Sequence, residues 1–141
     1  MYLLDTNVIS ELRKVGDGKA APEVVAWFTD LDASHAFISA LTLMEIEFGI
    51  LRLARRDPVQ AGHLRLWFDT RVLPEFAGRC LPVDMAVALR CARLHVPDPR
   101  SERDALIAAT ALVHGMVVVT RNVDDFAMMG VPLLDPWQCR S

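Results

Sequence analysis

The chain of 141 residues has little of what several large protein classes require. Its three cysteines show no CxxC spacing, which argues against a disulfide framework or a zinc site and favours a reducing cytosol. Its longest apolar stretches, such as residues 105–113, are too short to span a bilayer, so we expect no membrane partner. The opening MYLLDT has no basic segment, so no signal peptide is expected. These absences predict a cytoplasmic globular protein with one domain over residues 1–141.

Lysine is also scarce, and the chain has no net positive charge. The formal net charge is −3, and Lys14 and Lys19 are the only lysines, so the other basic side chains are arginines. Proteins that bind nucleic acid through overall electrostatic attraction are usually basic, which this chain is not. If the substrate is RNA, its binding must depend on local arginines, which suit phosphates, and on a bound metal.

The apolar residues fall into short runs that alternate with amphipathic segments. Strands are predicted at residues 1–4, 36–39, 80–83, 116–119 and 131–134. Helices are predicted at residues 22–31, 42–54, 59–72, 85–94 and 101–114, with a helical turn at 8–13 and a loop at 16–19. This alternation predicts an α/β fold with a central parallel sheet covered by helices on both faces.

Four separated acidic residues, Asp5, Glu45, Asp104 and Asp125, lie at or near the ends of apolar runs. Ligands of parallel sheets bind beyond the carboxyl ends of the strands, and all four residues can reach that rim. Carboxylates gathered there repel one another by about 4 kcal/mol per pair at ~4 Å and an effective dielectric of ~20. Such a cluster needs protons or a cation, and carboxylates without His or Cys suit Mg²⁺ or Mn²⁺. The sequence therefore predicts metal-dependent cleavage of a phosphodiester.

Each acidic residue also has a purely structural explanation. Asp5 could begin an Asx turn after its strand. Glu45 and Asp104, in the expected first turns of helices, could be placed there by the helix dipole. Asp124 and Asp125 could be plain turn residues, and we interpret Asp124 as one. The recurrence of the other four at predicted strand ends and helix starts favours the functional interpretation.

Several stretches occur together in a specific order and spacing. They are LLDTNVIS, ISALTLMEIEFGI, RDALIAATALVHGMVVVTRNVDDF and a closing Trp137. Together they resemble the PIN-domain ribonucleases, and within them the VapC-type toxins of VapBC toxin–antitoxin pairs. The resemblance spans nearly the whole chain and is weakest between Leu51 and Arg100. It implies a PIN-like three-layer sandwich and an endoribonuclease toxin that hydrolyses RNA to inhibit translation or growth.

The resemblance also implies partners. Members of this family are expected to form homodimers and to pair with a cognate VapB-type antitoxin. The antitoxin would block the site and bind operator DNA, so we expect DNA contact only through the antitoxin and RNA as the substrate.

Particular residues match the family's acidic site. Asp5, Glu45 and Asp104 match its first three acidic positions. Thr6 and Asn7 match polar positions that support the site. The resemblance thus implies that these carboxylates are both metal ligands and catalytic residues.

The fourth acidic position departs from the family pattern. Many PIN domains place an aspartate two residues after the threonine that matches Thr120, another supporting residue, but here that place is Asn122. We predict Asp125 as a secondary or water-mediated ligand and Asn122 as a neutral neighbour. One or two Mg²⁺ or Mn²⁺ ions would then be held by Asp5 and Asp104, with the remaining acidic residues completing the ring.

Different functions remain open. Phosphatases of the haloacid dehalogenase type also begin with a strand and an aspartate, but they need a second aspartate where this chain has Asn7. They also need a later lysine, which this chain lacks. The sequence is also compatible with a housekeeping ribonuclease of the PIN family and with a PIN-like fold that only binds a partner.

Overall fold

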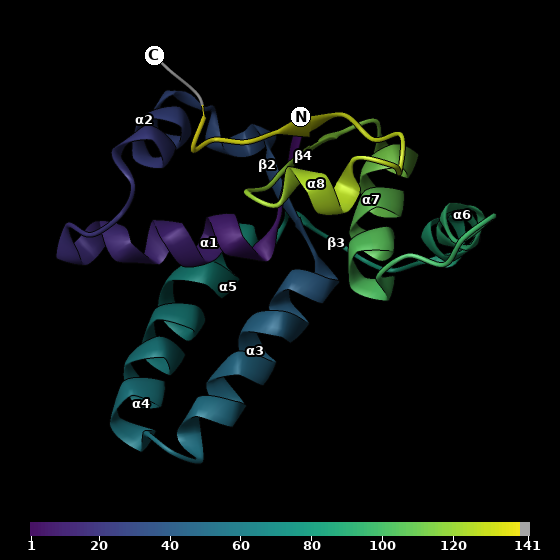
Figure 1. The fold of residues 1–141 in the computed structure, drawn as a ribbon. Coiled ribbons are helices and arrows are strands. Elements are labelled where there is room, and N and C mark those ends of the chain that lie inside the picture. Colours follow the sequence, from purple (N-terminus) through teal and green to yellow (C-terminus); the bar gives the residue numbers. More distant parts are fainter. Residues whose placement is uncertain (139–141) are drawn as a thin grey trace.

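Five parallel strands form one sheet in the computed structural model, which describes residues 1–138. The strand order is β3-β2-β1-β4-β5, and each neighbouring pair is parallel (Figure 1). The central strand β1 pairs with β4 so that Leu3 lies beside Val118. The strand bounds are β1 Tyr2–Leu4, β2 Ala36–Ser39, β3 Cys80–Leu81, β4 Val117–Val119 and β5 Leu133–Leu134.

Helices connect the strands and cover the sheet. Their bounds are α1 Thr6–Arg13, α2 Pro22–Asp30, α3 Ala40–Ala54, α4 Pro58–Trp67, α5 Leu73–Phe76, α6 Met85–Leu94, α7 Glu102–His114 and α8 Val123–Phe126. Three short turns of other helical types complete the connections: η1 Lys14–Asp17, η2 Ala33–His35 and the π-helical η3 Phe68–Val72. Figure 1 shows α3 and α4 side by side away from the sheet, and α6 on the outer side of α7.

The sheet separates two apolar cores. Successive side chains of a strand point to opposite faces, so Leu3 and Val118 enter one core while Leu4 and Val119 enter the other. The first core is closed by α6, α7 and α8, and the second by α1, α3 and the segment 68–76. Burial on both faces explains why the strands are continuously apolar. The predicted three-layer α/β fold is confirmed.

Two predicted helices have different bounds in the structure. Helix α3 begins at Ala40 rather than residue 42, because the Ser39 hydroxyl accepts a hydrogen bond of 3.1 Å from the Leu41 amide and caps the helix earlier. Glu45 therefore lies in the second turn, and its predicted first-turn position is wrong. The helix predicted at 59–72 lies within an unbroken helical stretch from Pro58 to Phe76, which becomes π-helical over Phe68–Val72, where the Thr70 hydroxyl donates to the Leu66 carbonyl at 2.6 Å.

The other predicted bounds differ by smaller amounts. The strand predicted at 80–83 ends at Leu81, before Pro82, which has no amide to donate. Helix α1 is longer than the predicted turn and starts directly after Asp5. Part of the predicted loop at 16–19 belongs to the η1 turn. Ser101 occupies the N-cap position of α7, although its side chain makes no capping hydrogen bond.

Two features of the chain bear on its expected environment. Within residues 1–138, none of the helices has the length and apolar character needed to cross a membrane. Cys80 and Cys91 are free thiols, and Cys139 lies outside the described residues.

Candidate active site

Asp5 connects the end of β1 to the start of α1. Its backbone amide donates to the Val119 carbonyl at 2.9 Å, which extends the β1–β4 pairing by one residue. Its Oδ1 accepts the Thr6 amide at 2.8 Å and so caps α1, which is the structural role that an Asx turn would also give it. Its Oδ2 accepts hydrogen bonds from the Thr120 hydroxyl at 2.8 Å and from the side-chain NH2 of Asn7 at 3.4 Å. The carboxylate is therefore held in one orientation, with only 7% of the residue exposed.

Thr120 joins the two chain segments that meet at this rim. It is fully buried at the carboxyl end of β4, and its hydroxyl accepts the Asn122 amide at 3.0 Å. The Asn7 side chain donates to the same hydroxyl at 3.3 Å and accepts the Arg121 amide at 3.3 Å. This network fixes the first turn of α1 against the loop after β4.

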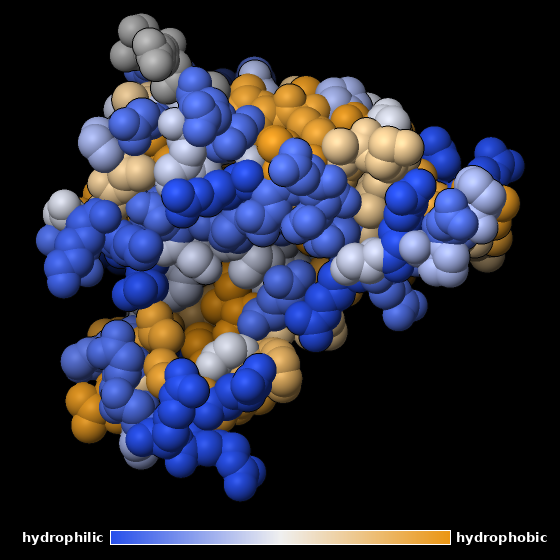
Figure 2. All heavy atoms as spheres, viewed as in Figure 1, coloured by the Kyte–Doolittle hydropathy of each residue, from blue (hydrophilic) through white to orange (hydrophobic). Residues whose placement is uncertain are grey.

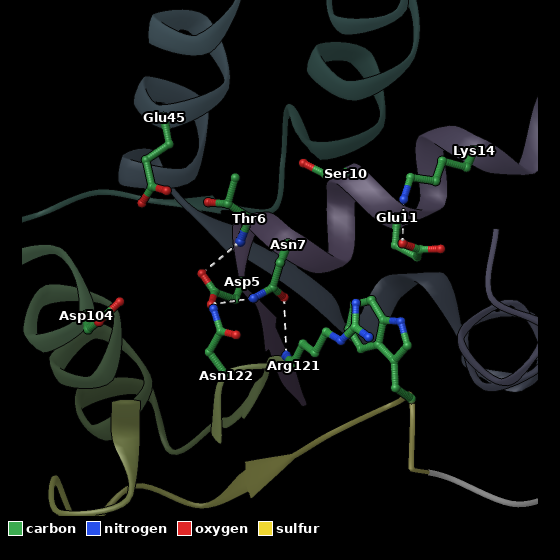
Figure 3. A pocket seen from close by; sticks show the side chains of 11 residues that line it. Asp5, Thr6, Asn7, Ser10, Glu11, Lys14, Glu45, Asp104, Arg121 and Asn122 are labelled. Atoms are coloured by element: carbon green, nitrogen blue, oxygen red, sulfur yellow. Dashed lines mark hydrogen bonds and ion pairs between the residues drawn. The ribbon is translucent and has the colours of Figure 1, made fainter. Parts of the chain in front are cut away.

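Three of the four predicted acidic residues line one cavity of about 450 Å³ at the carboxyl edge of the sheet. Asp5 follows β1, Glu45 comes from α3 after β2, and Asp104 comes from the start of α7 before β4. Figure 3 shows Glu45 and Asp104 on one side of Asp5, and Asn122 beside it. Asp125, on α8, is not among the described residues that line this cavity.

The acidic residues act on one another electrostatically. Burial raises the pKa of Asp5, against the hydrogen bonds from Thr120 and Thr6, and the charge of Asp125 raises it further. Burial and then the charge of Asp5 raise the pKa of Glu45. Burial raises the pKa of Asp104, followed by the charges of Asp5 and Asp125. Carboxyls whose pKa values are raised together in a cleft are typical of functional sites.

The oxygen donors suit a hard cation, although they are not drawn together. In the described part of the chain, no three Asp, Glu, His or Cys side chains lie close enough to form a metal-binding group. A carboxylate has about four lone-pair positions. Asp5 uses one on Oδ1 and two on Oδ2 for the hydrogen bonds given above. One position on Oδ1 remains for a cation, so the residues present fit a site of Mg²⁺ or Mn²⁺ type.

Comparison with known proteins agrees with this geometry. The profile of the PIN domain matches residues 2–131. The chain belongs to the PIN-domain family.

Named relatives of this PIN domain match along almost their whole length. It is 36% identical to VapC ribonuclease Y4jK of Sinorhizobium fredii, over 98% of this chain and 99% of the relative. It is 35% identical to Toxin FitB of Neisseria gonorrhoeae, over 97% of this chain and 99% of the relative.

Solved structures of toxin–antitoxin proteins also resemble the fold of this chain. FitAB bound to an IR36 DNA fragment superposes with a TM-score of 0.88 at 34% identity, over 100% of this chain and 99% of the other. A toxin–antitoxin complex from Klebsiella pneumoniae gives a TM-score of 0.69 at 26% identity, over 96% and 98% of the two chains.

The PIN-domain cavity has a second wall that the sequence did not reveal. Ser10 and Glu11 line it from α1, and Lys14 lines it from the start of η1. Glu11 accepts the Ala21 amide at 2.8 Å and pairs with Lys14 at 3.1 Å, and these contacts lower its pKa. The helical spacing of Asn7 and Glu11 could have placed both on one face, had α1 been predicted from Thr6 onwards. Because Glu11 is already satisfied by these partners, its role here is to position the chain after α1.

An arginine lies on the same side of the PIN-domain cavity. The Arg121 guanidinium stacks 5.0 Å from the centre of the Trp137 ring, and both residues line the cavity. Figure 3 shows Arg121 on the opposite side of Asp5 from Glu45 and Asp104. The site therefore combines carboxylates on one side with a guanidinium on the other, which suits a phosphate substrate.

An apolar groove adjoins the acidic cavity. It has a volume of about 310 Å³ and shares Thr6, Ser10 and Glu45 with that cavity. In Figure 2 an apolar hollow opens on this face between α1 and the pair α3 and α4. The apolar residues that line the groove are Ile46, Ile50, Leu53, Leu64 and Trp67, and the arginines are Arg13 and Arg56.

Proposed function

We propose that this protein is a metal-dependent endoribonuclease that acts as the toxin of a type II toxin–antitoxin pair in the cytosol. The observation that carries the proposal is the meeting of Asp5, Glu45 and Asp104 in one polar cavity at the carboxyl edge of a PIN-domain sheet. Relatives named as a VapC ribonuclease and as a toxin support the same activity over the full length of the chain.

The metal is proposed to be Mg²⁺ or Mn²⁺, because the donors are oxygens only. When bound, such a cation lowers the pKa of a coordinated water and stabilises charge on the phosphate and the leaving oxygen. Asp5 and Asp104 would hold it directly, with Glu45 and Asp125 completing the ring directly or through water. Because carboxylates of like charge repel, a bound cation or protonation would be needed to hold these side chains close together.

The neighbouring residues prepare Asp5 for this role. The Thr120 hydroxyl and the Thr6 amide donate to opposite carboxylate oxygens, which fixes the direction of the remaining lone pair. Asn7 holds both Asp5 and Thr120, so it supports the ligand from α1. Asn122 contributes a neutral polar group to the cavity wall. Removing such a partner of a metal ligand typically lowers metal affinity or activity by about 10- to 100-fold.

The partner is proposed to be a VapB-type antitoxin, which would also make the contact with operator DNA. The toxin–antitoxin complex and the DNA-bound FitAB structure support this partnership. The groove between α1, α3 and α4 supports it too, because an amphipathic helix can bind an apolar groove. The groove shares Glu45 and Thr6 with the acidic cavity, so a segment bound there would reach the active site. The protein itself is proposed to be a homodimer.

The test is cleavage of a small-RNA pool by purified protein with Mg²⁺, with Mn²⁺ and with chelator. Asp5→Asn is the matching variant, because Asn is also a good N-cap and keeps α1 in place. Asp98→Asn, in an exposed loop, is the control for a lost surface carboxylate. We expect discrete metal-dependent products from the wild type and from Asp98→Asn, and none from Asp5→Asn.

Other outcomes would change the assignment. Full metal-dependent cleavage by Asp5→Asn would contradict the role of Asp5. Release of inorganic phosphate from small phosphoesters, without RNA cleavage, would indicate a phosphatase. If the wild type neither cleaved RNA nor bound metal, the remaining interpretation would be a PIN-like fold that only binds a partner.

A further inference from the structure

Arg121 is a basic residue in the wall of the acidic cavity, on the turn that follows β4. Lys14 lines the same cavity, but it is paired with Glu11 at 3.1 Å. Among residues 1–138, Arg121 forms no ion pair with an acidic side chain. Because Arg121 is also exposed, its guanidinium is available to an anion that enters the cavity.

Both ends of Arg121 are held in place. Its backbone amide donates to Oδ1 of Asn7 at 3.3 Å, and the side-chain NH2 of Asn7 donates to Oδ2 of Asp5 at 3.4 Å. Its guanidinium lies 5.0 Å from the centre of the Trp137 ring. Arg121 is thus connected through one asparagine to a proposed metal ligand, and its charged end is placed by an aromatic ring.

Trp137 provides a fixed surface for this stack. It is half-buried and packs against the second apolar core. Its backbone amide donates to Oδ1 of Asp135 at 2.9 Å, which holds the turn that presents the ring. A planar guanidinium that stacks on an aromatic face keeps its N–H donors in its own plane, at the edge of the stack. The ring therefore orients Arg121 without using the donors that would bind a phosphate.

The charges around Asp5 are divided between two sides of the cavity. Figure 3 shows Glu45 and Asp104 on one side of Asp5 and Arg121 on the other. The phosphate that is cleaved would lie on the carboxylate side, at the proposed metal site. A neighbouring phosphate of the same strand needs a cation of its own, and a guanidinium matches phosphate oxygens in bidentate geometry. Because the chain has a net charge of −3, such binding depends on local cations.

We propose that Arg121 binds an RNA phosphate next to the one that is cleaved, and that Trp137 positions the guanidinium for this contact. This phosphate site rests on the proposed ribonuclease activity and deepens it. Arg121 touches the substrate, whereas Trp137 is a positioning residue that acts through Arg121. An acidic protein segment would be a different partner for the guanidinium. The place of Arg121 across Asp5 from the other carboxylates of the proposed metal site favours the RNA strand.

The first test measures the initial rate of cleavage of the small-RNA pool at increasing RNA concentration, with whichever of Mg²⁺ and Mn²⁺ supports cleavage. Arg121→Gln removes the charge and keeps much of the side chain's length. We expect it to raise the apparent KM about tenfold, as for the loss of one hydrogen bond to a charged group, while kcat falls much less. The logarithmic dependence of kcat/KM on salt should become shallower by about 0.7, because one phosphate contact is lost. A purely structural role would leave that dependence unchanged.

A second test determines whether Trp137 acts through Arg121. Trp137→Leu removes the π face, and we expect it to raise the apparent KM about two- to fivefold, the effect of one exposed cation–π contact. Trp137→Phe keeps an aromatic face and should restore most of this loss. In Arg121→Gln/Trp137→Leu the two effects should not add, because the ring has no guanidinium left to position.

Two controls separate this role from folding and from the metal site. Arg93→Gln removes another exposed arginine, on α6 and outside the acidic cavity, and should match the wild type in KM. Calorimetric titration should show that Arg121→Gln binds Mn²⁺ at least as tightly as the wild type, because a charge of the same sign has been removed from the cavity wall. Thermal unfolding midpoints verify that each variant is folded.

The outcomes separate the phosphate site from the activity on which it rests. If Arg121→Gln matches the wild type in KM and in salt dependence, the phosphate site is overturned while the ribonuclease stands. If the effects of the two substitutions add fully, Trp137 does not act through Arg121 and its positioning role fails. If Arg121→Gln weakens only the binding of antitoxin, the guanidinium serves a protein and the proposal fails. If the wild type cleaves no RNA with either metal, the proposed function fails and the phosphate site with it.

Discussion

The hydroxyl of Thr120 donates a hydrogen bond of 2.8 Å to Oδ2 of Asp5, although the two residues are 115 positions apart in the chain. The parallel pairing of β1 with β4 makes this contact, because it brings the carboxyl ends of both strands to the same rim. Thr120 is fully buried, so its hydroxyl has no access to water. The orientation of the proposed metal ligand thus depends on a buried residue that is not among the described residues lining the cavity.

Removing this hydroxyl tests how much the orientation matters. Thr120→Val keeps the shape of the side chain but leaves Oδ2 of Asp5 without its closest donor. We expect affinity for Mn²⁺ and the rate of RNA cleavage to fall about tenfold, as for other groups that hold a metal ligand in place. Thr120→Ser, which keeps the hydroxyl, should lie close to the wild type. Titration calorimetry with Mn²⁺ measures the affinity, and an unchanged affinity in Thr120→Val would contradict the role assigned to Thr120.

The raised pKa of Asp104 predicts how stability depends on pH. Burial, followed by the charges of Asp5 and Asp125, favours the protonated form of Asp104 in the folded protein. A carboxyl with a raised folded pKa stabilises the fold below its unfolded value of 3.8, and this contribution is lost as pH rises through the folded pKa. At pH 7 without metal, ionised Asp104 therefore destabilises the protein.

Asp104→Asn should remove this cost. We expect the variant to unfold at a higher temperature than the wild type at pH 7 in chelator, by an amount that solvent screening of this half-buried carboxyl keeps small. The difference should shrink towards pH 4, where the wild-type carboxyl becomes protonated. Adding Mn²⁺ should raise the unfolding temperature of the wild type more than that of the variant. Differential scanning calorimetry measures all three effects, and a lower unfolding temperature of Asp104→Asn at pH 7 in chelator would refute the explanation.

Much of the fold could be predicted because it depends on local patterns. The strands are continuously apolar, and their alternation with helices is sufficient to predict a parallel sheet buried on both faces. The rim position of Asp5 followed from the end of β1 alone. The meeting of Asp5 with Glu45 and Asp104 in one cavity followed from the rule that parallel strands end at the same edge.

The predicted helix bounds and geometries that differ from the structure depend on which of several local hydrogen bonds forms. Ser39 and Thr42 are both plausible places for α3 to begin, and the hydrogen bond of Ser39 to Leu41 decides between them. That choice moved Glu45 into the second turn. The Thr70 hydroxyl contact with the Leu66 carbonyl accompanies a change to π-helical geometry over Phe68–Val72 within the predicted helix, which apolar periodicity could not reveal.

At the fourth acidic position, the residue predicted as a ligand is not the residue that lines the cavity. Asn122 lines the cavity, whereas Asp125 acts on Asp5 and Asp104 through its charge and is not among the described lining residues. The orientation of α8, which carries Asp125, is set by burial of Phe126 in the first core, a tertiary effect absent from any local pattern. The predicted role of Asp125 as a water-mediated ligand therefore needs a direct test.

Two substitutions, one that removes the charge at residue 125 and one that adds a charge at residue 122, distinguish the roles of these two residues. Asp125→Asn should lower the cleavage rate about tenfold or less, as for a group outside the ligand set, while Asp104→Asn should abolish cleavage. Asn122→Asp adds a carboxylate to the cavity wall, and we expect it to tighten Mn²⁺ binding because affinity for hard cations rises with ligand charge. Calorimetric titration of both variants beside the wild type provides the comparison.

If Asp125→Asn were as inactive as Asp104→Asn, Asp125 would have to move into the cavity when the metal binds. If Asn122→Asp bound Mn²⁺ no more tightly than the wild type, residue 122 would lie too far from the cation to be a ligand.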